Sequence, residues 1–281
     1  MRISIGDLQY YRSVLDDIAS QASSYVRDAI EQLGDGQGVT AMREAAIEAL
    51  QESVGIHGEM SQSLAAQLFD EVCSMEGIGP YTFEMMDDII DFAMLEEKVR
   101  YYARSLVEHD GGDRFLNDCG QLADFYAWRV NRDSMVRNCE RNGVRYARVP
   151  TNSNACDYCV MLASRGFVYR TAKDAEAGSH AHCKCLVCPG GASTTIEGYD
   201  PDALYDQWKD SGFMPSAKGG SNKFVRADIR GKANTALKSI DNASSMDELR
   251  TLVNQTSTEG MTGKQIQGLQ WAVNRAKKRL S

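Results

Sequence analysis

The stretch DLQYYRSVLDDIASQASSYVRDAIEQLGDG, residues 7–36, decides the fold class of this chain. Within it, apolar residues recur every seven positions with a second apolar residue between them, which is the spacing of a helix that buries one seam. Asp7 is the expected N-cap, and the glycines from Gly34 onward end the pattern. The stretch therefore predicts one long amphipathic helix. Its seam consists of Leu8, Tyr11, Leu15, Ile18, Ala22, Tyr25 and Ala29.

Three further stretches downstream show helical spacing of apolar residues. The first begins after Thr40 and continues to about Glu76, with a break expected at 55–58 because two glycines fall there. The second covers about 81–108, and the third begins near Asp113, its expected cap. Long helices with short glycine-rich connections predict an antiparallel bundle. The apolar stripes are Phe83, Met86, Ile90 and Met94 in the second stretch, and Phe115, Cys119, Leu122, Tyr126 and Val130 in the third.

This amino-terminal domain, residues 1–142, contains methionines, cysteines and histidines for which the simplest interpretation is structural. Methionine fills irregular core gaps, and a cysteine at helical spacing behaves as a small buried apolar group. The histidines have no ligand-type neighbours in the sequence and are expected beside turns at the surface. The expected core residues are Met85, Met86, Met94, Cys73, Cys119 and Cys139, and the expected surface residues are His57 and His109.

The sequence changes character at Gly143, where a second predicted domain, residues 143–216, begins. Apolar and polar residues now alternate over short runs, which is typical of strands. This domain has few apolar residues, and a metal contributes most to folding where a core is small. The expected elements are strands at 144–149, 167–170 and 183–187, a short helix at 159–165 that ends at Gly166, and a helix at 202–208.

Two clusters of soft metal ligands lie in this domain, CDYC at 156–159 and HAHCKC at 180–185, with Cys188 just behind. Two close pairs separated by about twenty residues are the spacing of a structural zinc site. Cysteines that occupy a reducing cytosol stay unpaired, so metal ligation is favoured over disulfides. The sequence therefore predicts a Zn²⁺ ion held by four N or S ligands.

Cys156 and Cys159 are the first pair of ligands, and the second pair is open. On a strand, residues 183 and 185 face one way and residues 180 and 182 the other. A site filled by four protein ligands has no open position for water, so it is expected to do no chemistry. The alternatives for the second pair are Cys185 with Cys188, or His180 with Cys183 and Cys185, while His182 is a further candidate.

Charge is distributed unevenly along the chain. Residues 1–142 have a balance of −14, and residues 218–281 have a balance of +7. An acidic surface repels phosphate, which argues against nucleic-acid binding by the bundle. The basic carboxy-terminal segment, residues 217–281, is expected to form helices near 223–240, 246–254 and 262–279. This segment either contacts DNA or is a solvated helix end whose cations are stabilised by the helix dipole.

Neither a membrane span nor a secretory signal is expected. The chain has no run of eighteen apolar residues, and its first residues lack the apolar region of a signal peptide.

The middle of the chain resembles a known family. The motifs are RYARVP at 145–150, the first cysteine pair, LASRG at 162–166, VYR at 168–170 and the final H-x-x-C-x-C. They are similar to those of phage Mu F-like head morphogenesis proteins, the minor capsid proteins of tailed phages of Gram-positive and actinobacterial hosts. The resemblance is specific over about 144–189. It places the metal-like residues of the family at Cys156, Cys159, His180, Cys183 and Cys185.

The resemblance implies a virion protein, and no enzymatic activity is expected because a zinc site with four protein ligands has no open position for water. The resemblance also implies assembly at the portal vertex beside the portal or major capsid protein, in the capsid interior or at that vertex, after synthesis in the host cytoplasm. The alternative is a zinc-supported nucleic-acid-binding protein, nuclease or toxin. A zinc deaminase is excluded by the order of the motifs, since the H-x-E of that class should precede its cysteine pair.

Overall fold

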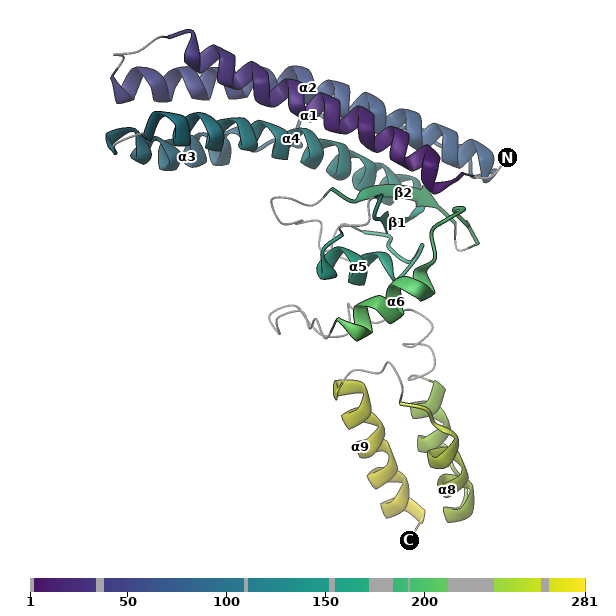
Figure 1. Ribbon diagram of the computed structural model, residues 1–281. Coiled ribbons are helices and arrows are strands. Elements are labelled where there is room, and N and C mark those ends of the chain that lie inside the picture. The colour runs from purple at the N-terminus through teal and green to yellow at the C-terminus, as the bar shows by residue number, and fades with distance from the viewer. Residues whose placement is uncertain are drawn as a thin grey trace. The chain divides into compact units, whose positions relative to one another are not determined.

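The computed structural model is mainly helical, as the sequence predicts (Figure 1). It has two compact units, Met1–Ala155 with Tyr169–Tyr199, and Cys156–Val168 with Asp200–Ser281. The segments expected to form one domain at 143–216 are thus divided between the two units. The structure describes residues 3–33, 38–108, 111–151, 155–171, 184–191, 193–211, 235–258 and 263–280.

Helix α1, Ile5–Glu31, begins with a capping box rather than at the expected N-cap. Ser4 is the N-cap, and its Oγ accepts from the Asp7 N–H at 3.2 Å while Oδ2 of Asp7 accepts from the Ser4 N–H at 2.8 Å. Asp7 is therefore the N3 residue of the box, because a carboxylate there can reach back to the N-cap amide. The predicted seam is confirmed at Leu8, Leu15, Ile18 and Ala22, which are buried.

Helix α2, Val39–Met75, continues without interruption, so the predicted break at 55–58 is wrong. A glycine costs a helix about 1 kcal/mol relative to alanine, and tertiary packing outweighs that cost here. Gly58 lies close to Ile90 and Val130. His57 is also buried rather than at the surface, and its Nδ1 lies 2.9 Å from the Ser53 carbonyl oxygen.

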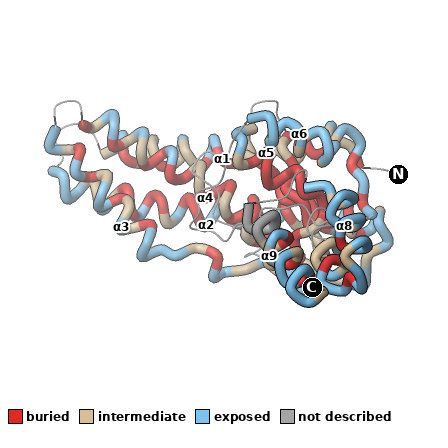
Figure 2. Tube along the Cα trace, turned by 90° about the horizontal axis from the view of Figure 1, so that it is seen from below, coloured by how far each residue is buried: buried red, intermediate tan, exposed pale blue. Residues whose placement is uncertain are grey.

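The helix predicted at 81–108 is wrong over its first part, 81–91, and the chain is helical from Phe92 to Val107. Helix α3 covers only Phe92–Tyr102 and continues as the 3-10 helix η1, Ala103–Val107. Residues 77–91, which we call the strap, contain no helix, and 81–86 contain neither turn nor bend. Figure 2 shows the strap as a mostly exposed trace beside α2 and α4. Met85 on the strap is 46% exposed and Met94 on α3 is 43% exposed, so the prediction that both fill the core is wrong.

Helix α4, Gly111–Asn142, has the predicted stripe, in which Phe115, Cys119, Leu122, Tyr126 and Val130 are all buried. It packs with α1 and α2 around a core that includes Val26, Ile30, Leu50 and Leu95. These positions lie on α1, α2 and α3, so the apolar faces of these three helices meet the stripe of α4.

Contacts between side chains fix the directions of the three long helices. Ser53 on α2 donates to the Ala22 carbonyl on α1 at 3.1 Å, and Tyr11 on α1 donates to Glu71 on α2 at 2.6 Å, so α1 and α2 are antiparallel. Arg27 on α1 donates to Asn117 near the start of α4, and Lys184 joins Asp16 on α1 to Asp124 further along α4. Helices α1 and α4 are thus antiparallel. Helices α2 and α4 are therefore parallel, because the strap and α3 return the chain between them.

The first unit also contains a two-stranded antiparallel sheet, β1 (Arg145–Val149) and β2 (Leu186–Gly190). Strand β1 is confirmed, and β2 lies three residues later than predicted. Pro189 is tolerated opposite Tyr146 because Tyr146 exchanges both backbone hydrogen bonds with Tyr169 instead, at 3.0 and 3.3 Å. The strand predicted at 167–170 is reduced to that single bridge. Strand β2 lies against α2 and α4, which buries the sheet.

The second unit contains α5 (Asp157–Ala163), α6 (Pro201–Asp210) and a helical carboxy-terminal part. Gly166 has φ +64°, as its predicted role at the end of a helix requires. In the carboxy-terminal part, a helix at 235–241, α8 (Met246–Gln255) and α9 (Gly263–Leu280) share a core of their own. That core is formed by Ile240, Ala243, Leu249, Leu269, Ala272 and Ala276.

None of the helices in the described ranges is both long and apolar enough to cross a membrane.

Candidate metal centre

The first cysteine pair lies at the start of α5, in the second unit. Cys156 is the N-cap and is exposed, and Cys159 lies in the first turn and is buried. Residues three apart on a helix are neighbours on one side of it. The donor chemistry of this pair thus fits a zinc ion.

The described part of the second cluster belongs to the first unit and begins at Lys184, whose ammonium contacts two helices. Nζ of Lys184 lies 3.1 Å from Oδ1 of Asp16 on α1 and 3.1 Å from both carboxylate oxygens of Asp124 on α4. The same ammonium lies 4.8 Å from the ring centroid of Trp128. Cys185 follows directly and is buried. One cation therefore fixes the chain beside Cys185 to two helices.

Two of the five predicted ligands, His180 and Cys183, lie outside the described residues, as does His182. Over the part of the chain that the structure describes, no group of three or more His, Cys, Asp or Glu side chains is placed to hold a metal ion. The complete ligand set, Cys156, Cys159, His180, Cys183 and Cys185, therefore stays a prediction.

Cys188 belongs to the core of the first unit. It is fully buried in β2 and lies near Cys73 on α2 and Cys139 on α4, which are fully buried too. Burial raises the pKa of the Cys73 thiol to about 12 and raises the pKa values of Cys139 and Cys188 as well, so all three are protonated at neutral pH. The placement favours a ligand set without Cys188.

The core roles predicted for three cysteines are confirmed. Cys73, Cys119 and Cys139 are completely buried. Desolvation raises the pKa of Cys119 to about 12. These thiols act as small apolar groups.

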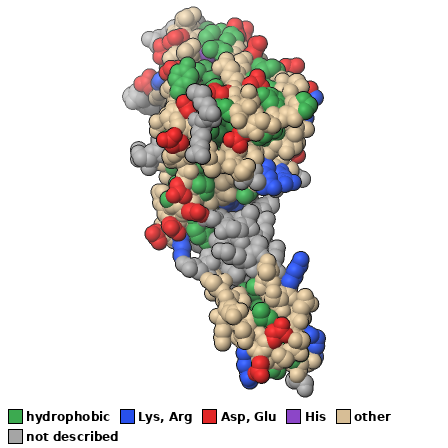
Figure 3. Space-filling view, turned by 90° about the vertical axis from the view of Figure 1, so that its right-hand side faces the viewer, with side chains coloured by type: hydrophobic (Ala, Val, Ile, Leu, Met, Phe, Trp, Pro, Cys, Tyr) green, Lys and Arg blue, Asp and Glu red, His purple; other side chains and the backbone are tan. Residues whose placement is uncertain are grey.

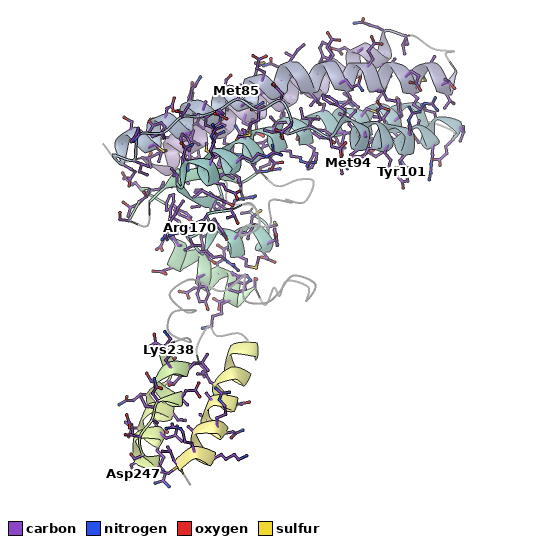
Figure 4. All side chains as sticks on the ribbon, turned by 180° about the vertical axis from the view of Figure 1, so that it is seen from behind. Met85, Met94, Tyr101, Arg170, Lys238 and Asp247 are labelled. Atoms are coloured by element: carbon purple, nitrogen blue, oxygen red, sulfur yellow. The ribbon has the colours of Figure 1, made fainter. Side chains whose placement is uncertain are left out.

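The arginines at positions 148, 165 and 170 do not form one exposed basic surface. Arg148 and Arg165 are buried, whereas Arg170, labelled in Figure 4, is exposed. Nε of Arg165 donates to the Met161 carbonyl within its own unit at 3.2 Å. A buried guanidinium cannot contact phosphate.

A second polar array, which the sequence did not reveal, binds the strap. Three side-chain amides of α2 and α4 each accept from the N–H and donate to the C=O of one strap residue, at 2.7–3.2 Å. The bound residues alternate along the strap, which is the two-residue period of an extended chain. The pairs are Asn142 with Thr82, Asn138 with Glu84, and Gln62 with Met86.

One feature of the sequence could have indicated this array, namely the helical spacing of the asparagines on α4. Asn131, Asn138 and Asn142 lie at helical intervals of seven and four, and Asn131 and Asn138 are buried. A buried amide needs partners. Only the structure shows that the partners of Asn138 and Asn142 include the backbone of the strap.

Comparison with known proteins gave one match. A family model described as VG15 protein matches residues 2–211, about three quarters of the chain. No curated protein and no solved structure matches.

Proposed function

Because the chain belongs to the VG15 family, a family of phage gene products, we propose that it is a minor head protein that acts in capsid assembly. In this proposal it contacts the portal or the major capsid protein, is present in the virion at the portal vertex or in the capsid interior, and catalyses no reaction. The motifs over 144–189 that resemble Mu F-like head morphogenesis proteins support this finer assignment.

The observation that carries the proposal is a set of large apolar side chains exposed on the strap and α3. Phe92 is 40% exposed and Tyr101 is 62% exposed. Figure 4 labels Met94 and Tyr101, which extend outward from α3, and it also labels Met85 on the strap, which is 46% exposed. Met94 and Tyr101 are seven apart and so lie on one side of α3. Apolar side chains gathered in this way are typical of surfaces that bind other proteins.

The test is binding to the head proteins encoded beside the gene. We expect full-length protein to bind purified portal or major capsid protein, and Met94→Glu with Tyr101→Glu to weaken binding by at least tenfold, since burying a charge in an apolar contact costs more than about 1.4 kcal/mol. Gln21→Glu, at an exposed position on α1, adds a negative charge away from this surface and should bind as wild type, and each single variant, Met94→Glu or Tyr101→Glu, should bind more weakly than Gln21→Glu. Equal binding by all of these proteins would contradict the proposed surface.

The proposed zinc ion is structural. Cys156 and Cys159 hold it with two of His180, Cys183 and Cys185, and zinc supplies folding energy there. About one zinc per chain is expected by elemental analysis. Cys159→Ser should lose the metal, whereas Cys119→Ser, which alters a core thiol, should retain it. Full metal content in Cys159→Ser would refute this ligand set.

DNA contact by residues 217–281 is the weaker alternative, because two arginines of this segment already form hydrogen bonds to residues of the same segment. Both Oδ atoms of Asp241 accept from Nη2 of Arg275 at 2.9 Å, and Arg279 donates to the carbonyls of Asp241 and Ala243 at 2.8 and 2.7 Å. Salt-dependent retention of the full chain on DNA, or metal-dependent strand cutting, would favour the nucleic-acid alternative instead.

A further inference from the structure

The strap has two edges, and within the described ranges only one of them is hydrogen-bonded over residues 82–86. Thr82, Glu84 and Met86 direct their backbone N–H and C=O groups to the three amides of α2 and α4. In an extended chain, the backbone groups of the intervening residues point the opposite way. Those residues are Phe83 and Met85, and neither has a backbone hydrogen bond to any residue that the structure describes.

We propose that this outer edge binds an extended segment of a partner protein, which adds to the strap as a β-strand. An unpaired edge is a template for such pairing, because main-chain hydrogen bonds supply affinity and side chains supply specificity. The amides of α2 and α4 hold the strap extended before the partner arrives, so little further ordering is needed on binding. Neither the zinc site nor the head-assembly role is required for this inference.

Charges beside the edge indicate the chemistry of the partner segment. Met85 is exposed, and Asp87 is exposed without an ion-pair partner among the described residues. Asp88 and Glu84 are already held by Arg137 and Arg141. Figure 3 shows acidic side chains spread among apolar ones over the larger part of the surface in view, which fits the acidic balance of residues 1–142. The edge therefore fits a segment in which apolar and basic residues alternate.

A second copy of the strap fits poorly. Parallel pairing of two straps would bring Asp87 and Asp91 of one copy near the same residues of the other, and antiparallel pairing about Glu84 would bring the two Glu84 residues together; like charges across a strand pair are unfavourable. A basic partner gains from the same carboxylates, and the balance of −14 over residues 1–142 attracts it at longer range.

The experiment measures binding of the full chain to short labelled peptides by fluorescence anisotropy. A peptide that alternates valine and lysine should bind saturably below about 1 mM. Methylating alternate amide nitrogens of the peptide should weaken binding roughly tenfold or more, because it removes the donors that pair with the edge. A peptide that alternates valine and glutamate should bind more weakly than the lysine peptide.

The matched variants are Met85→Pro and Met85→Ala. Proline removes the Met85 N–H, which has no partner in the described structure, and it favours an extended residue before it. Met85→Pro should therefore keep its melting temperature and lose peptide binding roughly tenfold, whereas Met85→Ala should bind within about threefold of wild type.

Two results would overturn the proposal. One is the absence of saturable binding of the lysine peptide to the wild-type chain. The other is equal binding of the methylated and unmethylated peptides, which remains decisive even if Met85→Pro unfolds. Tighter binding of the glutamate peptide would overturn the assigned charge of the partner.

Discussion

Replacing Asn138 by leucine should release the strap locally. The Asn138 side chain accepts from the Glu84 N–H at 2.7 Å and donates to the Glu84 carbonyl at 3.0 Å, and it is fully buried. Leucine keeps the size of the side chain and removes both hydrogen bonds. Each bond contributes about 1 kcal/mol net, and a partner left unpaired in a partly buried position adds to the loss. We expect the strap to lose about 2–3 kcal/mol of local stability.

Hydrogen exchange is the assay, because it reports the opening of individual amides. In the wild-type protein, the amides of Thr82, Glu84 and Met86 should be protected while those of Phe83 and Met85 exchange freely. In Asn138→Leu, exchange at Glu84 should accelerate roughly 30- to 150-fold, which is the rate equivalent of that free energy.

The matched control is Asn117→Leu on the same helix. Asn117 is exposed and, among the residues that the structure describes, accepts from Arg27 alone, so its loss should change stability by less than about 0.5 kcal/mol. Uniform protection across 82–86, or unchanged exchange at Glu84 in Asn138→Leu, would refute the amide array.

Three further predictions concern the first unit. Gly58→Ala should stabilise α2 by about 0.5–1 kcal/mol in urea denaturation, because a Cβ there meets ordinary contacts of 3.8 Å; destabilisation would show that the helix–helix approach is tighter than described. Lys184→Met should lower the free energy of unfolding by about 1–2 kcal/mol through loss of two ion pairs and the contact with Trp128, with a smaller effect in high salt; a salt-independent loss would point to packing instead. Hydrogen bonds from Ser4 lower the pKa of Asp7 below its unfolded value, so this stabilisation is present at neutral pH and is lost as the pH falls below about 4; Ser4→Ala should raise that pKa toward its ordinary value in an NMR titration, and an unchanged titration would contradict the capping box.

Local patterns predicted the long helices well, because each reflects interactions between near neighbours. The seam of α1, the stripe of α4 and the left-handed Gly166 follow from spacing and backbone sterics alone. The strap shows where such patterns fail. Residues 81–94 have helical apolar spacing, but amides from α2 and α4 satisfy the strap backbone and so stabilise an extended chain. Neither Gln62 nor Asn138 is near the strap in the sequence.

The types of ligand at the candidate metal site could be predicted from the sequence, but the contacts that surround them could not. The short helix predicted at 159–165 is present as α5, although it begins earlier, at Asp157. Nothing in the sequence links Lys184 to Asp16 or Asp124, because all three residues look like ordinary surface charges. Cys188 was left open because a strand pattern does not state which face the bundle covers, and the packing of β2 decides that.

Mass spectrometry of purified particles tests the proposed role most directly. Particles should be prepared from the phage or induced prophage that carries the gene, with whole-cell lysate as the control for expression. The head-protein account predicts that the full chain is present in the particles in a constant ratio to the portal protein. Particles that lack the chain while the lysate contains it would contradict that account.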